Sequence, residues 1–130
     1  MLNLGVMSGK HSRILVVDDD PDWLELMTEL FEDEGYTVAV ANDGARAAAM
    51  VPRFHPAVVV TDLQMPHMDG QQLLAALRAR QPGVPVVVMT GDRTRTHDPS
   101  LKGAFRIMEK PPSIEKLLAV VADASSASSP

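Results

Sequence analysis

Two kinds of hydrophobic pattern alternate along the chain. Five short runs of apolar, mostly β-branched residues are bounded by Asp, Gly or Pro, as buried strands commonly are. Because the apolar residues in these runs are continuous rather than alternating with polar ones, the pattern favours a parallel sheet covered on both faces. The runs cover residues 14–17, 36–40, 57–61, 84–89 and, more weakly, 105–108.

Between these runs, apolar residues recur at the spacing of an amphipathic helix, i, i+3, i+4 and i+7. Asp20-Pro21 and Ser113 are typical of helix starts, and Gly35 stands where the first helix should end. The spacing predicts four helices with these apolar faces: Trp23, Leu26, Met27 and Leu30; Ala47, Met50, Val51 and Phe54; Leu73, Leu74 and Leu77; Ile114, Leu117, Leu118 and Val121.

Strict alternation of strands and helices predicts right-handed crossovers onto one parallel sheet, with helices on both faces. We therefore expect a three-layer, doubly wound α/β protein with five strands. Residues 91–102 interrupt the pattern because they are polar and contain Pro99. We expect only a short or mobile helix there.

Composition narrows the class of protein. The 130 residues suit one domain, and 45% of them are hydrophobic. The absence of cysteine excludes disulfides and thiolate metal sites and fits a reducing compartment such as the cytoplasm. The net charge of −5 argues against non-specific binding to nucleic acid or to an anionic membrane. No apolar run approaches the roughly 20 residues of a membrane span.

The two ends of the chain differ in composition from the rest. Residues 1–12 are mixed, lack the apolar stretch of a signal peptide, and are expected to form a flexible N-terminal segment. The Ser/Ala-rich residues 125–130 are expected to form a flexible tail or the start of a linker. The ordered domain should then span residues 13–124, either as a complete protein or as part of a longer one.

Polar residues gather just after the predicted strands. The first strand is followed by Asp18 and Asp19, the third by Asp62, the fourth by Thr90 and the fifth by Lys110. In an open parallel sheet, ligands bind beyond the carboxyl ends of the strands, so we expect these side chains to converge.

Three carboxylates held together repel one another and resist ionisation unless a cation balances them. Oxygen-rich coordination with open positions suits Mg2+, which also accepts phosphate oxygens. A helix cap with favourable dipole interactions is the alternative role for these first-strand acids. That role accounts for Asp20 but not for the pair Asp18 and Asp19 after a buried strand.

Asp62 is a candidate nucleophile, because a carboxylate can accept a phosphoryl group as an acyl phosphate. Lys110 could neutralise charge on that group, and Thr90 could donate a hydrogen bond to it. Each residue has a plainer alternative role. Asp62 could bond its own loop, Lys110 could be an ordinary surface lysine, and the Thr90 hydroxyl could cap the next loop.

Four motifs resemble the receiver domain of two-component response regulators over about residues 13–123. They are Ile14-Leu-Val-Val-Asp-Asp-Asp-Pro-Asp22, Val59-Val-Thr-Asp-Leu-Gln-Met-Pro-His-Met-Asp-Gly70, Val87-Val-Met-Thr-Gly91, and Gly103-Ala104 followed by Glu109-Lys110-Pro111. The second motif is the most specific of the four.

The resemblance implies a flavodoxin-like sheet of strand order 2-1-3-4-5 and a set of site roles. Asp62 would be phosphorylated, and Asp18, Asp19, Asp62 and the backbone carbonyl of Gln64 would bind Mg2+. Thr90 and Lys110 would contact the phosphoryl group, and the bond from Lys110 to Pro111 would be cis.

The resemblance also implies a function. A sensor histidine kinase or phosphotransfer protein would donate the phosphoryl group, and its arrival would switch a partner-binding surface. The chain would be a cytoplasmic signalling domain rather than an enzyme, although it would promote its own phosphorylation and dephosphorylation. A homodimer formed on activation is compatible with the resemblance, and direct contact with nucleic acid or membrane is not expected. The downstream effector is not identified.

Two departures from the family pattern leave other functions open. Ile107 occupies the switch position that is usually aromatic, and Phe105, two residues earlier, is expected to face the same side of the strand. The short segment 91–102 also predicts an unusual output face. One alternative is a phosphorylation-independent interaction module on the same fold. Another is a small phosphatase of the haloacid dehalogenase type, with Asp18 as nucleophile in an Asp-x-Asp pattern with Asp20.

Overall fold

The structure is a computed structural model that describes residues 12–127. The predictions for residues 1–11 and 128–130 lie outside this range. Among the described residues, no helix combines the length and the apolar character that crossing a membrane requires.

Five parallel strands form one sheet in the order β2-β1-β3-β4-β5. This order confirms the predicted doubly wound α/β class and the flavodoxin-like topology. It places β3 at the centre with β1 and β4 beside it, so that each of these three strands is paired on both sides. The strands are β1 (Arg13–Val17), β2 (Thr37–Ala41), β3 (Val58–Asp62), β4 (Val86–Thr90) and β5 (Arg106–Glu109).

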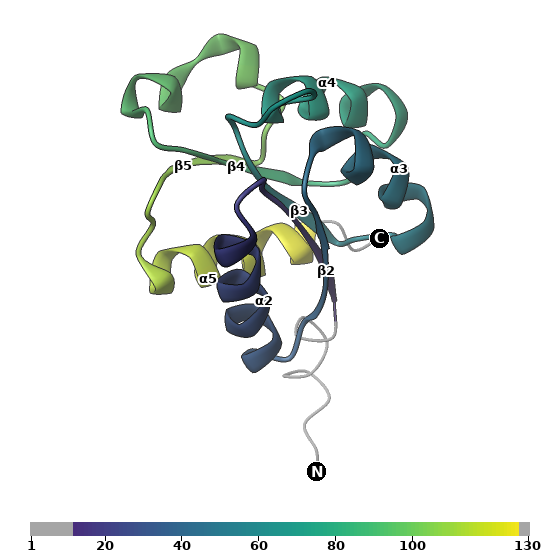
Figure 1. Ribbon diagram of the computed structural model, residues 1–130, viewed down its shortest axis with the longest axis vertical. Helices are drawn as coiled ribbons and strands as arrows, with labels where there is room; N and C mark the ends of the chain where they lie inside the picture. Colours follow the sequence, from purple (N-terminus) through teal and green to yellow (C-terminus); the bar gives the residue numbers. More distant parts are fainter. Residues whose placement is uncertain (1–11, 128–130) are drawn as a thin grey trace.

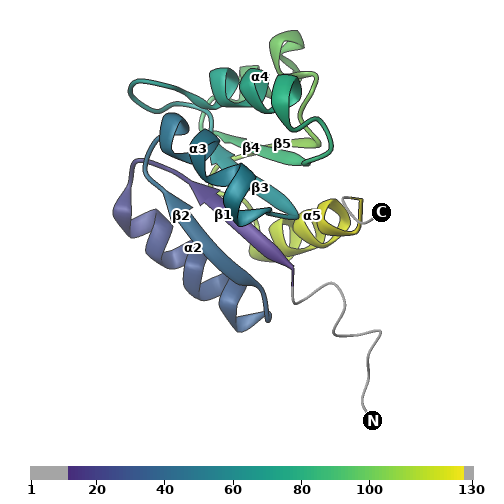
Figure 2. The ribbon, with the colours of Figure 1, turned by 90° about the vertical axis from the view of Figure 1, so that its right-hand side faces the viewer.

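Helices cover both faces of the sheet, as Figures 1 and 2 show. α2 (Pro21–Asp33) and α5 (Ile114–Ala127) lie on one face, and α3 (Gly44–Phe54) and α4 (Gly70–Arg80) lie on the other. Successive residues of a strand belong to two separate hydrophobic clusters. Ile14 and Val16 face α2 and α5, whereas Leu15 and Val17 face α3 and α4. The continuous apolar runs therefore arise because both faces of each central strand are buried.

The predicted helix ends are confirmed. Asp20 caps α2 by accepting a hydrogen bond from the backbone N–H of Asp22, and Ser113 accepts one from the N–H of Lys116 in α5. Gly35 follows α2 with a positive φ of 95°, a conformation that glycine adopts without strain. The caps at Asp20 and Ser113 fix where the chain enters α2 and α5 after it leaves the carboxyl edge of the sheet.

The domain boundary that the sequence placed at residue 124 is too early for the last helix. α5 continues to Ala127, and Ser125 is 2% exposed. The Ser125 hydroxyl donates to the carbonyl of Ala122, so the helix tolerates the serine by bonding it back to its own previous turn. The serine-rich composition alone did not reveal this continuation.

Two residues assigned to helical apolar faces are instead exposed. Leu26 is 55% exposed and Ile114 is 59% exposed. The buried face of α2 is centred on Met27 and Phe31, which turns Leu26 toward the rim of an apolar cavity between α2 and α5.

The expected short helix between β4 and β5 is a pair of 3-10 turns, η1 (Arg93–His97) and η2 (Pro99–Leu101). The Asp92 carboxylate accepts from the N–H of Thr94, and the Asp98 carboxylate accepts from the N–H of Ser100. Each short turn therefore begins at its own aspartate cap, and only Leu101 anchors the segment in the core.

Candidate acidic site at the carboxyl edge of the sheet

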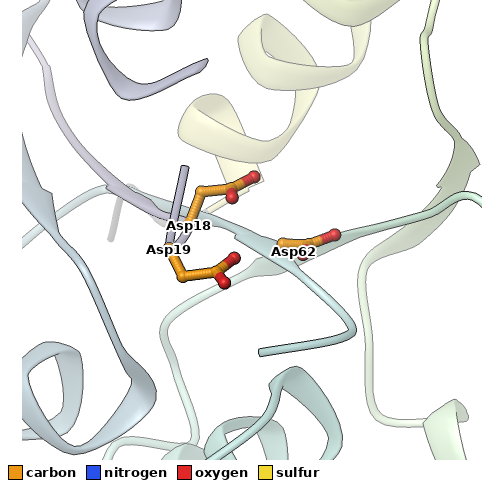
Figure 3. A group of neighbouring side chains, drawn as sticks. All are labelled: Asp18, Asp19 and Asp62. Atoms are coloured by element: carbon orange, nitrogen blue, oxygen red, sulfur yellow. The ribbon is translucent and has the colours of Figure 1, made fainter. Parts of the chain in front are cut away.

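Three carboxylates meet where β1 and β3 end. The two strands are paired in parallel, with Val17 opposite Thr61, so the residues that follow them lie side by side. Asp18, Asp19 and Asp62 each place a carboxylate oxygen within 4.8 Å of the others (Figure 3). The convergence predicted for these three acids is thus present in the structure.

Lys110 adds a positive charge to this cluster from the end of the edge strand β5. It follows β5, and its backbone N–H donates to the carbonyl of Thr90 at 2.8 Å. Its Nζ lies 2.7 Å from Asp18 Oδ2 and 3.8 Å from Asp62 Oδ1. The peptide bond from Lys110 to Pro111 is cis, as expected.

Asp18 is the buried member of the cluster, at 1% exposure. Both of its carboxylate oxygens are engaged, since Oδ2 accepts from Lys110 and Oδ1 accepts from the N–H of Asp20 at 3.0 Å. Asp19, by contrast, is exposed. The adjacent acids therefore differ in environment: one is held in the interior and the other faces solvent.

The pKa of Asp62 is raised to about 6. Burial is the largest cause, and repulsion from Asp18 and Asp19 adds to it, whereas Lys110 and a hydrogen bond from the N–H of Leu63 act in the opposite direction. A single lysine thus does not balance three carboxylates. The donor set fits a hard divalent cation such as Mg2+, which would favour the ionised form of Asp62.

Gln64 and Thr90 flank the cluster in different ways. The side chain of Gln64 is exposed in the loop that follows Asp62. Thr90 is fully buried at the end of β4, and its hydroxyl interacts with Asp92, accepting from the N–H at 3.0 Å and donating to the carbonyl at 3.3 Å. In this structure Thr90 therefore caps the next loop, which was the plainer of its two predicted roles.

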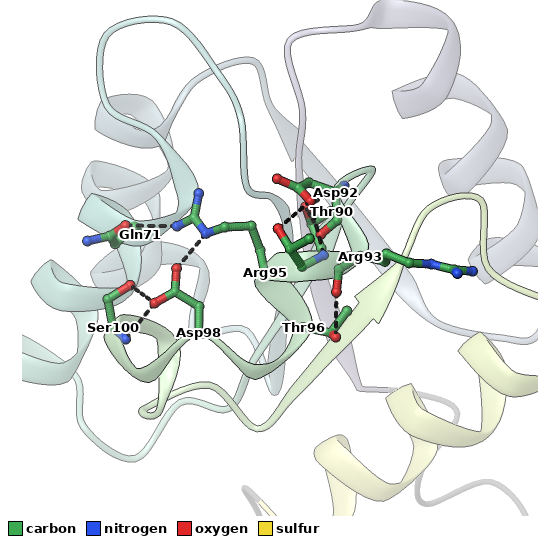
Figure 4. A network of polar contacts seen from close by, with 9 residues as sticks. Gln71, Thr90, Asp92, Arg93, Arg95, Thr96, Asp98 and Ser100 are labelled. Atoms are coloured by element: carbon green, nitrogen blue, oxygen red, sulfur yellow. Dashed lines mark hydrogen bonds and ion pairs between the residues drawn. The ribbon is translucent and has the colours of Figure 1, made fainter.

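The loop after Thr90 belongs to a polar network shown in Figure 4. The Asp92 carboxylate also accepts from the hydroxyl of Thr94 at 2.6 Å. Farther along, Arg95 joins Asp98 at 2.5 Å and reaches Gln71 of α4 at 3.1 Å. This network connects the buried end of β4 to η1, η2 and α4.

The relation expected between Phe105 and Ile107 is wrong. Ile107 packs against the cluster under α3 and α4, whereas Phe105 packs against the cluster under α2 and α5. Phe105 precedes β5, so the alternation of side chains within a strand does not constrain it. An aromatic ring is therefore absent from the Ile107 position, and Phe105 does not replace it.

Sequence reasoning missed two residues that shape the site. A Cβ on Gly70 would lie 2.5 Å from the carbonyl oxygen of Asp62, so only glycine fits beside the acidic loop. Trp23, assigned only to a helical apolar face, holds its ring 4.4 Å from Lys110 Nζ. Gly70 belongs to a motif that the sequence shows, so its importance had a local signal. No local pattern indicated that Trp23 contacts Lys110.

The family described as "Response regulator receiver domain" matches residues 14–122. The chain is 36% identical over 126 residues to the transcriptional regulatory protein GlrR of Escherichia coli (strain K12), which covers 95% of the chain and 28% of GlrR. It is 39% identical over 118 residues to the DNA-binding response regulator MtrA of Mycolicibacterium smegmatis, covering 88% of the chain and 51% of MtrA. The chain therefore spans at most about half of these relatives.

Solved structures show the same fold. The response regulator TrrA of Thermotoga maritima, solved in complex with Mg(2+)-BeF, superposes with a TM-score of 0.82 at 26% identity, covering 87% of this chain and 98% of TrrA. The beryllofluoride-activated NtrC4 receiver domain dimer gives a TM-score of 0.81 at 28% identity, covering 90% of this chain and 98% of NtrC4.

Proposed function

This chain belongs to the response regulator receiver domain family of two-component signalling proteins, and on that basis we propose that it accepts a phosphoryl group onto Asp62. The donor is a phosphohistidine on a sensor histidine kinase or phosphotransfer protein. The observation that carries the proposal is the position of the Lys110 ammonium, which contacts Asp18 and stands 3.8 Å from Asp62.

In the proposed step, a carboxylate oxygen of Asp62 attacks the phosphorus in line. The new O–P bond forms as the P–N bond to the donor imidazole breaks, and the imidazole leaves with the bonding electron pair. Lys110 donates to a phosphoryl oxygen and offsets the charge on the transferred group. Asp18 keeps that ammonium in the pocket through its 2.7 Å contact.

The carboxylates of Asp18, Asp19 and Asp62, together with the backbone carbonyl of Gln64, would hold Mg2+. The spacing of the three carboxylates, within 4.8 Å of one another, supports this assignment. When bound, the cation supplies charge neutralisation for the carboxylates and for the phosphoryl oxygens. The same groups, with water, would promote loss of the phosphoryl group, so that the domain resets without acting on another substrate.

We assign the switch to Thr90. Its hydroxyl would leave Asp92 and donate to the phosphoryl oxygen, which would loosen the start of η1. A partner would then read the changed surface formed by η1, β5 and α5. Because Ile107 has no ring to rotate, the loop rather than an aromatic side chain would carry the signal.

The full-length context is part of the proposal. GlrR is a transcriptional regulatory protein by name and MtrA a DNA-binding one, and the chain covers 28% and 51% of them. We propose that this domain works in the cytoplasm and controls such an output through protein contacts. On this account it does not bind nucleic acid itself, which its net charge of −5 supports. The NtrC4 dimer supports a homodimer on activation as one form of that contact.

The environment of Asp18 argues against the phosphatase alternative. That reaction needs a free carboxylate oxygen on Asp18, yet both oxygens are engaged and the residue is 1% exposed. Asp62 is the more accessible acid, with a side chain that is 13% exposed.

Intact-mass measurement after incubation with Mg2+ and acetyl phosphate tests the proposal. We expect one phosphoryl adduct on the wild type and on the control Asp123→Asn, an exposed acid of α5, and none on Asp62→Asn. If the wild type forms no adduct, beryllofluoride binding separates a donor mismatch from a true lack of function. Failure of both would support a phosphorylation-independent interaction module.

A further inference from the structure

Trp23 is the only tryptophan of the chain, and its ring lies against the Lys110 ammonium at the acidic site. It is the third residue of α2, one turn after the Asp18–Asp20 segment. The Lys110 Nζ is 4.4 Å from the ring centroid, well inside the roughly 6 Å range of a cation–π interaction. Among aromatic side chains, the indole face attracts a cation most strongly.

The ring is held in place by the core rather than by the lysine. Trp23 is partly buried and packs against the hydrophobic cluster under α2 and α5. It also forms a wall of the apolar cavity that reaches Pro111, the residue after Lys110. A packed ring offers a fixed surface to a mobile ammonium.

The ammonium needs such a surface because its stem is flexible. Lysine carries a compact charge on a flexible four-carbon stem, and the carboxylates of Asp18 and Asp62 both lie within 4 Å of it here. Asp18 draws Nζ to 2.7 Å, away from Asp62 at 3.8 Å. The ring limits where the ammonium can go while it stays between these two acids.

We propose that Trp23 is a positioning residue for Lys110: its indole face holds the ammonium where it can reach a phosphoryl group on Asp62. This inference rests on the proposed function, since it assigns a role within the same site. Trp23 acts only through Lys110, so its removal should weaken recognition of the phosphoryl group and leave the carboxylate cation site nearly unchanged.

Beryllofluoride, a phosphoryl mimic, measures this effect when its affinity is determined at saturating Mg2+. We expect Trp23→Leu, which keeps an apolar side chain without a ring, to bind beryllofluoride roughly three- to tenfold more weakly than the wild type. Trp23→Phe, which keeps a weaker ring face, should recover most of the loss. Mg2+ affinity measured alone should change by less than about twofold in both variants.

Leu26→Ala is the matched control, because Leu26 lines the same cavity from α2 and carries no ring that could hold an ammonium. It should bind both ligands as the wild type does. Equal beryllofluoride affinity in the wild type and Trp23→Leu would overturn the inference. A parallel loss of Mg2+ affinity would also overturn it, because that pattern indicates a packing role.

Fluorescence provides a second test that does not depend on substituting Trp23. Since the chain has one tryptophan, its emission reports on position 23 alone. Removing the ammonium with Lys110→Met should change the emission of the ligand-free protein, whereas Lys102→Met should not. Unchanged emission in Lys110→Met would contradict the contact. If the wild type bound no beryllofluoride, the proposed function would fail, and the emission comparison would still judge the contact between Trp23 and Lys110.

Discussion

The Lys110 ammonium contacts Asp18 rather than Asp62, at 2.7 Å against 3.8 Å. The Lys110 ammonium therefore pairs closely with the buried Asp18 and less closely with Asp62, the proposed phosphoryl acceptor. Burial of Asp62 and repulsion from Asp18 and Asp19 raise its pKa to about 6, so the ionised form of this carboxyl group is disfavoured in the metal-free pocket. A bound divalent cation would supply the positive charge that Lys110 alone does not provide to the three carboxylates.

Removing the lysine should destabilise the protein. Lys110→Met leaves the Asp18 carboxylate, 2% exposed, without its cationic partner, and we expect a loss of about 1–3 kcal/mol in the free energy of unfolding. Urea unfolding near neutral pH measures it. Lys102→Met, an exposed lysine, should change stability by less than about 0.5 kcal/mol. Equal stability of the two variants would contradict the pairing described here.

Asp62 should make the stability of the metal-free protein depend on pH. Its folded-state pKa of about 6 is above its ordinary 3.8, so between these values the folded state holds a proton that the unfolded state has lost. Raising the pH through that window therefore lowers the free energy of unfolding, by up to about 3 kcal/mol. Above this pH window, the ionised Asp62 carboxylate continues to destabilise the folded state.

Asp62→Asn removes this titration. Without metal, the variant should be more stable than the wild type at about pH 7.5, and the difference should shrink as the pH falls from about 6 to about 4. Excess Mg2+ should stabilise the wild type more than the variant. Urea unfolding across this pH range provides the measurement. A wild type that gains stability relative to Asp62→Asn as the pH rises from about 4 to about 6 would refute the assigned direction of the pKa shift.

Gly70 should tolerate no side chain. The Cβ of Gly70→Ala would lie 2.5 Å from the Asp62 carbonyl oxygen and 2.9 Å from Leu63 Cα, and neither backbone atom can move without displacing the acidic loop. We expect a loss of about 2 kcal/mol in stability and weaker beryllofluoride binding. Gly83→Ala is the control, since its Cβ would meet nothing within 4 Å. Similar behaviour of the two variants in unfolding and binding assays would rule out the close approach.

Thr90 should control the stability of η1. When Mg2+ and beryllofluoride bind, loss of the contacts between Thr90 and Asp92 should speed hydrogen exchange in η1 by roughly fivefold. Thr90→Val lacks these contacts in both states, so its η1 should exchange rapidly without ligand and respond little to it. Thr28→Val, which removes a hydroxyl bonded within α2, is the control. An unchanged ligand response in Thr90→Val would exclude this coupling.

The continuous apolar runs predicted the parallel sheet, and the acidic cluster was predicted because the carboxyl ends of parallel strands share one edge. Once β1 and β3 are adjacent, parallel pairing alone brings Asp18 and Asp62 together. The contact between Trp23 and Lys110 was not predictable in this way, since it depends on how α2 is rotated over the sheet. The same rotation exposes Leu26, which the helical spacing had assigned to the buried face.

Position 105 shows a second limit of sequence patterns. Alternation assigns a residue to one face only while it belongs to a regular strand, and β5 begins at Arg106. The segment before it also forms two capped 3-10 turns in place of one helix, because Asp92 and Asp98 each start a new turn. Such local side-chain bonds compete with the periodic signal on which the prediction depended.

Locating the acyl phosphate by chemical reduction tests the central claim most directly. After phosphorylation with acetyl phosphate and Mg2+, borohydride converts a phosphorylated aspartate to homoserine, and tandem mass spectrometry identifies its position. The account predicts homoserine at position 62 alone. Homoserine at position 18 or 19, or at no position in a protein that has gained a phosphoryl group, would contradict it.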